Sequence, residues 1–302
     1  MGLTRDLATV ARGWRWGHQP LVPRSVEAPA PVTPARDLAW ARGPAASQAR
    51  ALILRFGLAP LLHAEVNVSV HGREALDGLR PPVVFVANHT SHLDAPLILT
   101  ALPSRWQKRT AVGAAADYFF DAWWRAQTTA LVFNAFPVER SGALRSVGVA
   151  RDLLAQRWNL LVFPEGTRSH DGWMGDFKRG AAMLAAYSGV PIVPVALHGA
   201  FRAMPRGRAW PLPGRPAVSI RFGAPVVPTD GERTAELNER VRSALARALH
   251  EEDATWWEAQ RAAAAEATSD PSGPPATRWR RVWDATRPPP PPRRAWPRSP
   301  RG

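Results

Sequence analysis

The sequence predicts an α/β domain with a mostly parallel central sheet flanked by helices. Short apolar segments typical of buried strands alternate along the chain with longer segments whose apolar residues recur at helical spacing. Strands that alternate with helices favour parallel pairing, because each helix carries the chain back to the starting edge of the sheet. The middle of the chain also has an ordinary globular composition. Of the formal net charge of +14, residues 1–50 carry +4 and residues 271–302 carry +7, which leaves +3 for the residues between them.

The strand predictions rest on alternation or on short apolar runs. Residues 65–70 alternate with period two, as in a half-buried strand, and residues 83–87 form an apolar run after two prolines. Pro137 disfavours helix at the residue before it, so residues 131–138 are expected to be extended at least in part. The remaining predicted strands are residues 109–113, 160–163, 192–197 and 217–222.

The helix predictions rest on apolar spacing and on capping residues. Ser91 and Ser141 precede apolar helical patterns and can cap them. Gly189 suits a helix C-terminus because glycine tolerates positive φ. The predicted helices are an apolar patch at 51–62, residues 91–99, 121–130, 141–154 and 177–188, and an Ala-rich helix at 231–268.

The composition divides the chain into regions and excludes several classes of protein. We expect an Arg/Pro-rich N-terminal extension over residues 1–50, one domain over 51–230, the Ala-rich helix over 231–268 and a disordered, basic Pro-rich tail over 269–302. The absence of Cys excludes a disulfide framework, a thiolate zinc site and a Cys nucleophile. We expect no transmembrane helix, because the uncharged run at residues 180–201 is interrupted by prolines. Residues 1–19 hold no apolar core of signal-peptide length, so secretion is not indicated.

The first cluster of chemistry-bearing residues runs from Asn88 to Asp94, after a predicted buried strand and at the start of a helix. Ligands of α/β proteins bind where strands end at their carboxyl edge. A turn at this junction would let Asp94 meet His89, and a His steadied by a carboxylate is suited to taking a proton from a hydroxyl. Two alternatives stay open. Ser91 and Asp94 also form a capping box that would simply start the helix, and His89, His92 and Asp94 could hold a metal, as in a metal hydrolase.

Three further clusters carry basic residues suited to an anion. Residues 163–169, Phe-Pro-Glu-Gly-Thr-Arg-Ser, offer backbone N–H groups, hydroxyls and a guanidinium for a phosphate, with a surface turn as the alternative. Arg140 ends another extended segment, where Glu139 could equally form a surface pair with it. Lys178 and Arg179 fall in the first turn of a predicted helix, where the macrodipole disfavours cations unless an anion binds nearby.

Together and in this order, these segments resemble the glycerolipid acyltransferase family that includes the lysophosphatidic acid acyltransferases. That family's pattern is Asn-His-x4-Asp, Phe-x-x-x-Arg, Phe-Pro-Glu-Gly-Thr-Arg-Ser, Phe-Lys-x-Gly-Ala and an apolar Val-Pro-x-x-Pro-Val segment. The corresponding segments here are residues 88–94, 136–140, 163–169, 177–181 and 190–195. The resemblance covers roughly residues 51–230 and implies a single domain of the glycerolipid-acyltransferase type.

The resemblance implies a role for each motif. His89 would be the general base and Asp94 its orienting partner, while Pro191 would shape the acyl-donor side. The residues that would bind the phosphate and glycerol end of the acceptor are Arg140, Glu165, Gly166, Thr167, Arg168 and Lys178. The implied reaction transfers an acyl chain from acyl-CoA or acyl carrier protein to a lysophospholipid, most directly 1-acyl-sn-glycerol 3-phosphate, and uses no metal and no cofactor beyond that co-substrate. Many members carry Lys near the positions of Ala115 and Ala116, so another lysolipid acceptor stays an alternative.

A lipid substrate implies contact with a membrane surface. We expect a peripheral or monotopic protein at the cytoplasmic face of the cell membrane, docked by the apolar patch at 51–62 and by aromatic residues that could equally be core. Those aromatic residues are Trp106, Tyr118, Phe119, Phe120, Trp123 and Trp124. The basic tail would add attraction to anionic lipid, about 1 kcal/mol per basic residue near the surface. The same tail leaves a membrane- or nucleic-acid-binding protein as an alternative class. The near-neutral middle region carries no recognisable nucleic-acid module, so no nucleic acid partner is expected.

Overall fold

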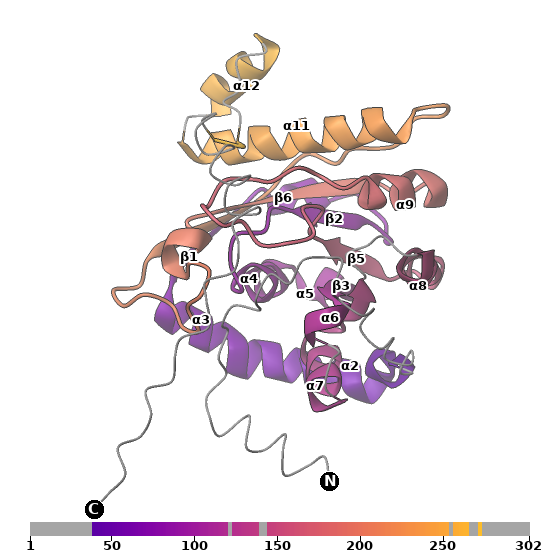
Figure 1. Cartoon of the computed structure of the whole chain (residues 1–302), viewed down its shortest axis with the longest axis vertical. Helices are drawn as coiled ribbons and strands as arrows, with labels where there is room; N and C mark the ends of the chain where they lie inside the picture. Colours follow the sequence, from indigo (N-terminus) through magenta and orange to yellow (C-terminus); the bar gives the residue numbers. More distant parts are fainter. Residues whose placement is uncertain (1–37, 120–122, 139–143, 254–255, 266–270, 274–302) are drawn as a thin grey trace, which may run out of the picture.

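The computed structural model describes residues 38–119, 123–138, 144–253, 256–265 and 271–273 (Figure 1). Arg140, Phe120, the predicted cap at Ser141 and the basic tail beyond residue 273 lie outside the described residues. Within the described ranges, strands and helices alternate along the chain, and the helices lie on both faces of one sheet.

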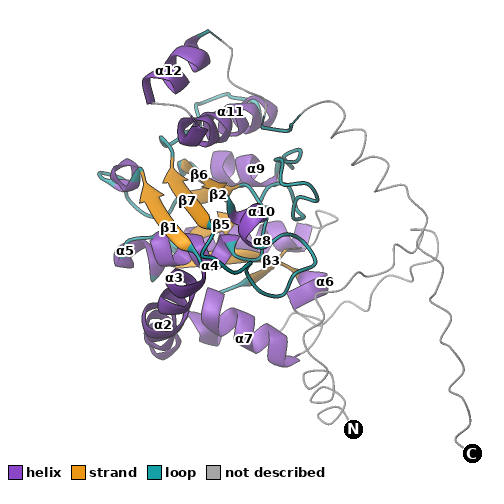
Figure 2. Cartoon of the chain, turned by 90° about the vertical axis from the view of Figure 1, so that its left-hand side faces the viewer, coloured by secondary structure: helices purple, strands orange, loops and turns teal. Residues whose placement is uncertain are grey.

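Seven strands of the described residues form this sheet, in the order β1-β7-β6-β2-β5-β3-β4 (Figure 2). Neighbouring strands are parallel except β6 and β7, which are antiparallel. The strands are β1 (Asn67–His71), β2 (Val84–Ala87), β3 (Thr110–Ala115), β4 (Phe136–Val138), β5 (Asn159–Val162), β6 (Ile192–His198) and β7 (Ala217–Phe222). The prediction of a mostly parallel sheet flanked by helices is confirmed.

The helices connect the strands and also precede and follow the sheet in the chain. The first described helices are η1 (Ala39–Arg42), α2 (Pro44–Leu52), the π-helical segment η2 (Ile53–Leu58), α3 (Ala59–Glu65) and η3 (Arg73–Leu76). Between β2 and β5 lie α4 (Asp94–Ala101), α5 (Ser104–Gln107), α6 (Ala116–Phe119), α7 (Trp123–Phe133) and α8 (Leu144–Ala155). The remaining helices are α9 (Gly180–Ser188), α10 (Ala200–Ala203), α11 (Thr234–Asp253) and α12 (Trp256–Ala264).

Two apolar layers cover the sheet, and the alternation of side chains along β2 shows how they form. Val84 and Val86 pack with residues of α8, α9 and α11 on one face. Phe85 and Ala87 pack on the other face with α4, η2 and α3. Figure 1 shows α9 and α11 on one side of the sheet and α2, α3 and α4 on the other. Because β2 is buried on both faces, the residues that follow its carboxyl end start from a rigid core.

Helix α9 begins later than predicted. The backbone N–H of Lys178 donates to the carbonyl of Pro164 at 2.9 Å, which holds this segment alongside the end of β5 and delays the helix until Gly180. The prediction that Lys178 and Arg179 lie in its first turn is therefore wrong, and both residues precede it. The C-terminal end agrees with the prediction, because Gly189 follows the helix with φ of +61°.

The N-terminal helices also differ from the predicted ranges. The expected domain start at residue 51 falls inside α2, which begins at Pro44. Arg50 of this helix is 3% exposed and donates hydrogen bonds to the carbonyls of Leu131 at 2.8 Å and Ala130 at 3.2 Å. Desolvation lowers the pKa of Arg50 to about 10, with a further contribution from the charge of Arg42. These hydrogen bonds tie α2 to the end of α7, which continues to Phe133. Of residues 131–138, which were expected to be extended at least in part, Phe136–Val138 form strand β4.

The C-terminal part of the described chain packs against the sheet. The expected Ala-rich helix is found as α11 and α12. Residues 271–273, which were expected to belong to a disordered tail, contact the domain instead. The carbonyl of Pro271 accepts a hydrogen bond from the N–H of Met174 at 3.0 Å, and Arg242 Nη2 donates to Ser272 Oγ at 2.8 Å.

Candidate active site

The candidate site begins where β2 ends, at Asn88. Its side chain takes the place of a backbone peptide between β2 and β6: Nδ2 donates to the carbonyl of Leu197 at 2.9 Å, and the N–H of Leu197 donates to Oδ1 at 2.8 Å. The side chain therefore continues the ladder of the sheet while the backbone turns away from it. This turn releases His89 from the sheet at a fixed position.

His89 and Asp94 meet across this turn, as predicted. Nδ1 of His89 lies 2.9 Å from Oδ2 of Asp94, and the Asp94 side chain is fully buried while that of His89 is 23% exposed. The same Oδ2 accepts hydrogen bonds from the backbone N–H groups of Thr90 at 2.7 Å and Ser91 at 2.8 Å. The His–Asp pair is thus present, and the same oxygen also accepts from the N–H of Ser91. The prediction that Ser91 caps the helix is wrong, because α4 begins at Asp94 with Leu93 at its N-cap. A Nδ1–H donated to the carboxylate leaves Nε2 of His89 as the basic ring nitrogen.

Glu165 and Phe163 fix His89 from the opposite side. The His89 ring stacks on Phe163, with ring centroids 4.1 Å apart and an angle of 24° between the planes. Glu165 is buried, and its two carboxylate oxygens accept from the N–H groups of His89 and Gly175, each at 2.7 Å. The structure places Glu165 among backbone donors, and it is not among the described residues that line the cavity below. These contacts support a positioning role for Glu165 beside His89, and the expected contact with the acceptor stays a prediction.

A cavity of about 550 Å³ opens at His89. Its apolar part runs between the sheet edge at β3 and β4 and the helices α7, α8 and α9, and a volume of this size is typical of a small-molecule pocket. The apolar lining includes Val112, Ala115, Phe119, Phe133, Phe136, Val138, Val147, Val162, Met183 and Leu184. The polar lining consists of His89, His92, Thr129, Thr167, Arg168, Lys178, Arg179 and Arg206. The cavity therefore joins a basic entrance to an apolar interior.

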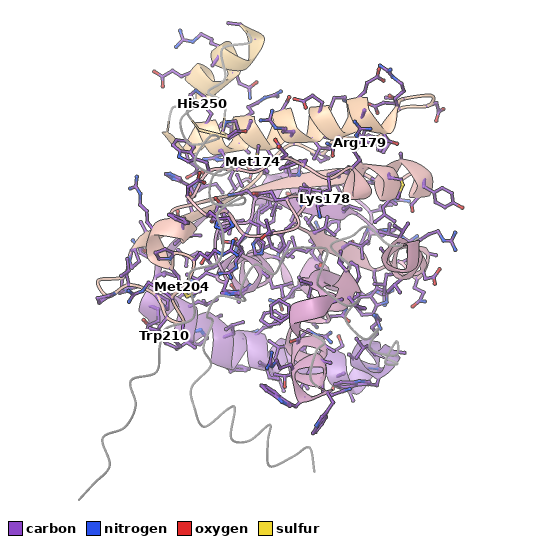
Figure 3. The ribbon with its side chains drawn as sticks, in the orientation of Figure 1. Met174, Lys178, Arg179, Met204, Trp210 and His250 are labelled. Atoms are coloured by element: carbon purple, nitrogen blue, oxygen red, sulfur yellow. The ribbon has the colours of Figure 1, made fainter. Side chains whose placement is uncertain are left out.

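The basic entrance is built by two segments, one that follows β5 and one that precedes α9. Gly166 adopts φ of +71°, and a Cβ atom added there would lie 2.8 Å from Nζ of Lys178, so glycine lets the lysine side chain cross over the turn. Thr167 and Arg168 follow on the same turn and also line the cavity, as expected from the sequence. Lys178 and Arg179 lie on the segment that leads into α9 (Figure 3). Two of the three basic clusters expected from the sequence are thus gathered here, and the third, which contains Arg140, lies outside the described residues.

His92 lies in the cavity wall and is electrically neutral at pH 7. Burial lowers its pKa to about 3, and the nearby charges of Arg168, His89 and Arg206 contribute in the same direction. Within the described part of the chain, no group of three or more His, Asp or Glu side chains is arranged to hold a metal ion. The geometry brings His89 and Asp94 together as a pair, whereas His92 is a neutral side chain in the cavity wall.

Sequence reasoning missed some of these residues and misplaced another. Arg206 lines the cavity without belonging to any predicted motif, and Arg179, which was predicted as part of a basic cluster, was not assigned to the site. Asn88 was seen only as part of a motif, whereas its contacts with β6 are what direct the turn. Pro191 precedes β6 beside Val84, at the amino ends of both strands, and so lies at the opposite edge of the sheet from His89.

The comparisons with known proteins agree with this geometry. Residues 67–198, which include the His–Asp turn and the basic segments, match the family model described as Acyltransferase. Residues 67–198 are therefore similar to an acyltransferase domain. A 1-acyl-sn-glycerol-3-phosphate acyltransferase of Chlamydomonas reinhardtii is 34% identical over 187 residues, which are 61% of this chain and 53% of that protein. The mouse 1-acyl-sn-glycerol-3-phosphate acyltransferase alpha is 36% identical over 182 residues, which are 57% of this chain and 60% of that protein.

A solved structure supports the same assignment of fold. The crystal structure of the 1-acyl-sn-glycerophosphate acyltransferase PlsC from Thermotoga maritima matches with a TM-score of 0.54 and 27% sequence identity. The match covers 72% of this chain and 83% of that chain. The chain spans about half the length of the curated relatives named above. The acyltransferase domain therefore carries the His–Asp pair and the basic turn, while α11 and the loop that holds Arg206 lie beyond residue 198.

Proposed function

We propose that this protein transfers a fatty acyl chain from a thioester, acyl-CoA or acyl carrier protein, to the free hydroxyl of 1-acyl-sn-glycerol 3-phosphate, which gives phosphatidate. The observation that carries the proposal is the His89–Asp94 pair at 2.9 Å, placed at the junction of a basic entrance and an apolar cavity. The relatives named 1-acyl-sn-glycerol-3-phosphate acyltransferase support this choice of acceptor. No other cofactor is needed for this chemistry.

His89 acts as the general base in the proposed reaction. Asp94 accepts the hydrogen bond from Nδ1–H of His89, which leaves Nε2 free to take a proton. Nε2 removes the proton of the acceptor hydroxyl while the hydroxyl oxygen attacks the thioester carbonyl carbon. The carboxylate also stabilises the imidazolium that forms. When the tetrahedral intermediate collapses, the C–S bond breaks and the imidazolium returns the proton to the thiolate. The products are a new ester and a free thiol, and the step requires no protein nucleophile.

The two parts of the cavity suit the two parts of the substrates. A phosphate at the entrance would be neutralised by Arg168 and Lys178, because guanidinium and ammonium groups form charge-assisted hydrogen bonds with phosphate oxygens. An acyl chain would occupy the apolar interior, where its burial is favourable. This arrangement favours a lysolipid with an anionic headgroup over one with a cationic headgroup.

We further propose that the helical run α2–η2–α3 and the start of α7 dock on a membrane surface. Exposed apolar side chains gather on these helices, and α2 packs against α7. These side chains are Leu52, Phe56, Leu61 and Trp123, and the exposed Trp40 lies on η1, which directly precedes α2. Trp106, which was considered for this surface, is 1% exposed and packs edge-on against Phe85 with ring centroids 6.0 Å apart, so it belongs to the core. None of the described helices is both long and apolar enough to cross a bilayer. We propose contact with the cytoplasmic face of the membrane, where acyl-CoA and acyl carrier protein are formed.

The test is acyl transfer from labelled oleoyl-CoA or oleoyl-carrier protein to a panel of lysophospholipids. The panel compares the wild type with His89→Ala and with the control His250→Ala, which alters a histidine of α11 far from the cavity (Figure 3). Product with lysophosphatidate that is lost only in His89→Ala supports the proposal. Product with a different headgroup alone overturns the acceptor, and no product with either donor overturns the reaction.

A further inference from the structure

Arg206 reaches the candidate site from a loop beyond the matched acyltransferase domain. This loop follows α10 and is tied to the same turn that carries the His–Asp pair, because Ser91 Oγ donates to the carbonyl of Met204 at 2.9 Å. A second backbone hydrogen bond joins Leu212 N–H to the carbonyl of Ala203 at 2.7 Å, which closes the loop on itself. Met204, labelled in Figure 3, is buried. The base of the loop is therefore fixed relative to His89.

The guanidinium of Arg206 lies against the turn that follows β5 and carries Thr167 and Arg168. Nη1 donates to the carbonyl of Arg168 at 3.3 Å and also contacts Nε2 of His170. Arg206 lines the same cavity as Arg168 and His89. Both arginines also lower the pKa of His92 by their charge.

Among the described residues around the entrance, cationic side chains outnumber carboxylates. The lining contains four cations, namely Arg168, Lys178, Arg179 and Arg206, and no carboxylate. The end of β3 contributes only Ala114 and Ala115 to the lining, so no positive charge enters from that strand. Several cations that line one cavity favour the binding of an anionic group there.

We propose that Arg206 binds the phosphate of the acceptor together with Arg168 and so determines the preference for a phosphomonoester headgroup. This inference rests on the function proposed above. A guanidinium presents two parallel N–H donors that match two phosphate oxygens. Because the Arg206 side chain is already held by its contacts with Arg168 and His170, it loses less conformational freedom when the phosphate binds. Arg206 is a specificity residue and does not move a proton in the reaction.

The test compares Arg206→Gln and Arg206→Lys with the control Arg208→Gln, which removes an exposed arginine of the same loop whose Nε donates to the Trp210 carbonyl. We expect Arg206→Gln to raise the KM for lysophosphatidate about tenfold or more, with kcat and the KM for oleoyl-CoA close to wild type. Arg206→Lys should raise the KM for lysophosphatidate less than Arg206→Gln does, because lysine keeps the positive charge but lacks the paired N–H donors of a guanidinium. Activity on monoacylglycerol, which has no phosphate, should not change.

The outcomes separate this inference from the proposed function. An unchanged KM for lysophosphatidate in Arg206→Gln, or a rise confined to the KM for the donor, overturns the role of Arg206. Absence of transfer to any acceptor by the wild type overturns the proposed function instead. In that case, calorimetric titration with sn-glycerol 3-phosphate still tests Arg206: weaker binding by Arg206→Gln than by Arg208→Gln supports the inference, and equal binding by both variants overturns it.

Discussion

Oδ2 of Asp94 lies 2.9 Å from Nδ1 of His89, and the same atom receives two backbone N–H groups of the turn between them. The carboxylate that orients the proposed base therefore also shapes the turn that presents it. Three hydrogen bonds to one oxygen fix the position of this carboxylate. Asp94 is fully buried, so its orientation is independent of solvent.

Asp94→Asn should lower kcat by about 10²–10⁴-fold with little change in KM for the acceptor, because an amide stabilises neither the imidazolium nor the required tautomer of His89. Steady-state kinetics with lysophosphatidate measures this loss. Asp152→Asn, which alters an exposed carboxylate 3.9 Å from Arg151, serves as the matched control and should retain full activity. A kcat within threefold of wild type would exclude Asp94 from the reaction.

Glu165→Gln should reduce both stability and activity. One of the two backbone donors, from His89 or from Gly175, would face an NH₂ group in place of an oxygen, and an unsatisfied buried donor costs about 1–3 kcal/mol. Urea denaturation measures the stability, and the acyl-transfer assay measures the accompanying fall in kcat. Glu65→Gln, at a half-buried carboxylate that is not part of the cavity lining, provides a control that removes the same charge. Normal stability and kcat in Glu165→Gln would refute the positioning role.

The neutrality of His92 makes the folded protein sensitive to acid. Its pKa is about 3 in the folded state and about 6.5 in an unfolded chain, so between these values the unfolded chain binds a proton that the folded protein does not. Stability contributed by His92 is thus present above pH 6.5 and decreases as the pH falls, by about 2 kcal/mol between pH 7 and pH 5. His92→Gln should show a smaller decrease over this range. Urea unfolding of both proteins at pH 7 and pH 5 measures the difference, and parallel decreases would contradict it.

Ala115→Phe should shift the preferred acyl chain to a shorter length. Ala115 ends β3, is partly exposed and lines the cavity, so a larger side chain there would fill space without displacing the core. Competition among C12 to C18 donors, repeated with C12 to C18 acceptors, measures which substrate chain occupies the interior. Unchanged preferences for both substrates would show that neither acyl chain lies beside β3.

Leu52→Ser combined with Phe56→Ser should weaken retention on phosphatidylglycerol-containing vesicles several-fold, because both side chains are exposed on the proposed docking helices. Tyr187→Ser on α9 is the control, since this residue is even more exposed but lies on the opposite side of the sheet (Figure 1). Vesicle sedimentation at low and high salt provides the measurement. Equal losses for the control and the double variant would indicate that α2 and η2 do not form the docking surface.

Local patterns allowed accurate prediction where local forces decide the structure. β7 matches its predicted range, and the turn that joins His89 to Asp94 followed from a strand end and a helix start close together in the chain. The start of α9 did not follow, because a hydrogen bond between Lys178 and Pro164 competes with the helix. Arg206 could not be found from spacing, since it meets the site only through the anchoring of its loop. Tertiary contacts of this kind leave no periodic trace in a sequence.

Asn88 links the chemistry of the site to the cooperativity of the fold. Its amide forms two hydrogen bonds of the central β2–β6 ladder, so the geometry of His89 persists only while those strands stay paired. Central strands are the last part of a domain to open, and local fluctuations at the edges leave them intact. Loss of the catalytic geometry on heating should therefore coincide with global unfolding. Enzymes whose catalytic groups lie on mobile surface loops instead lose activity before the transition.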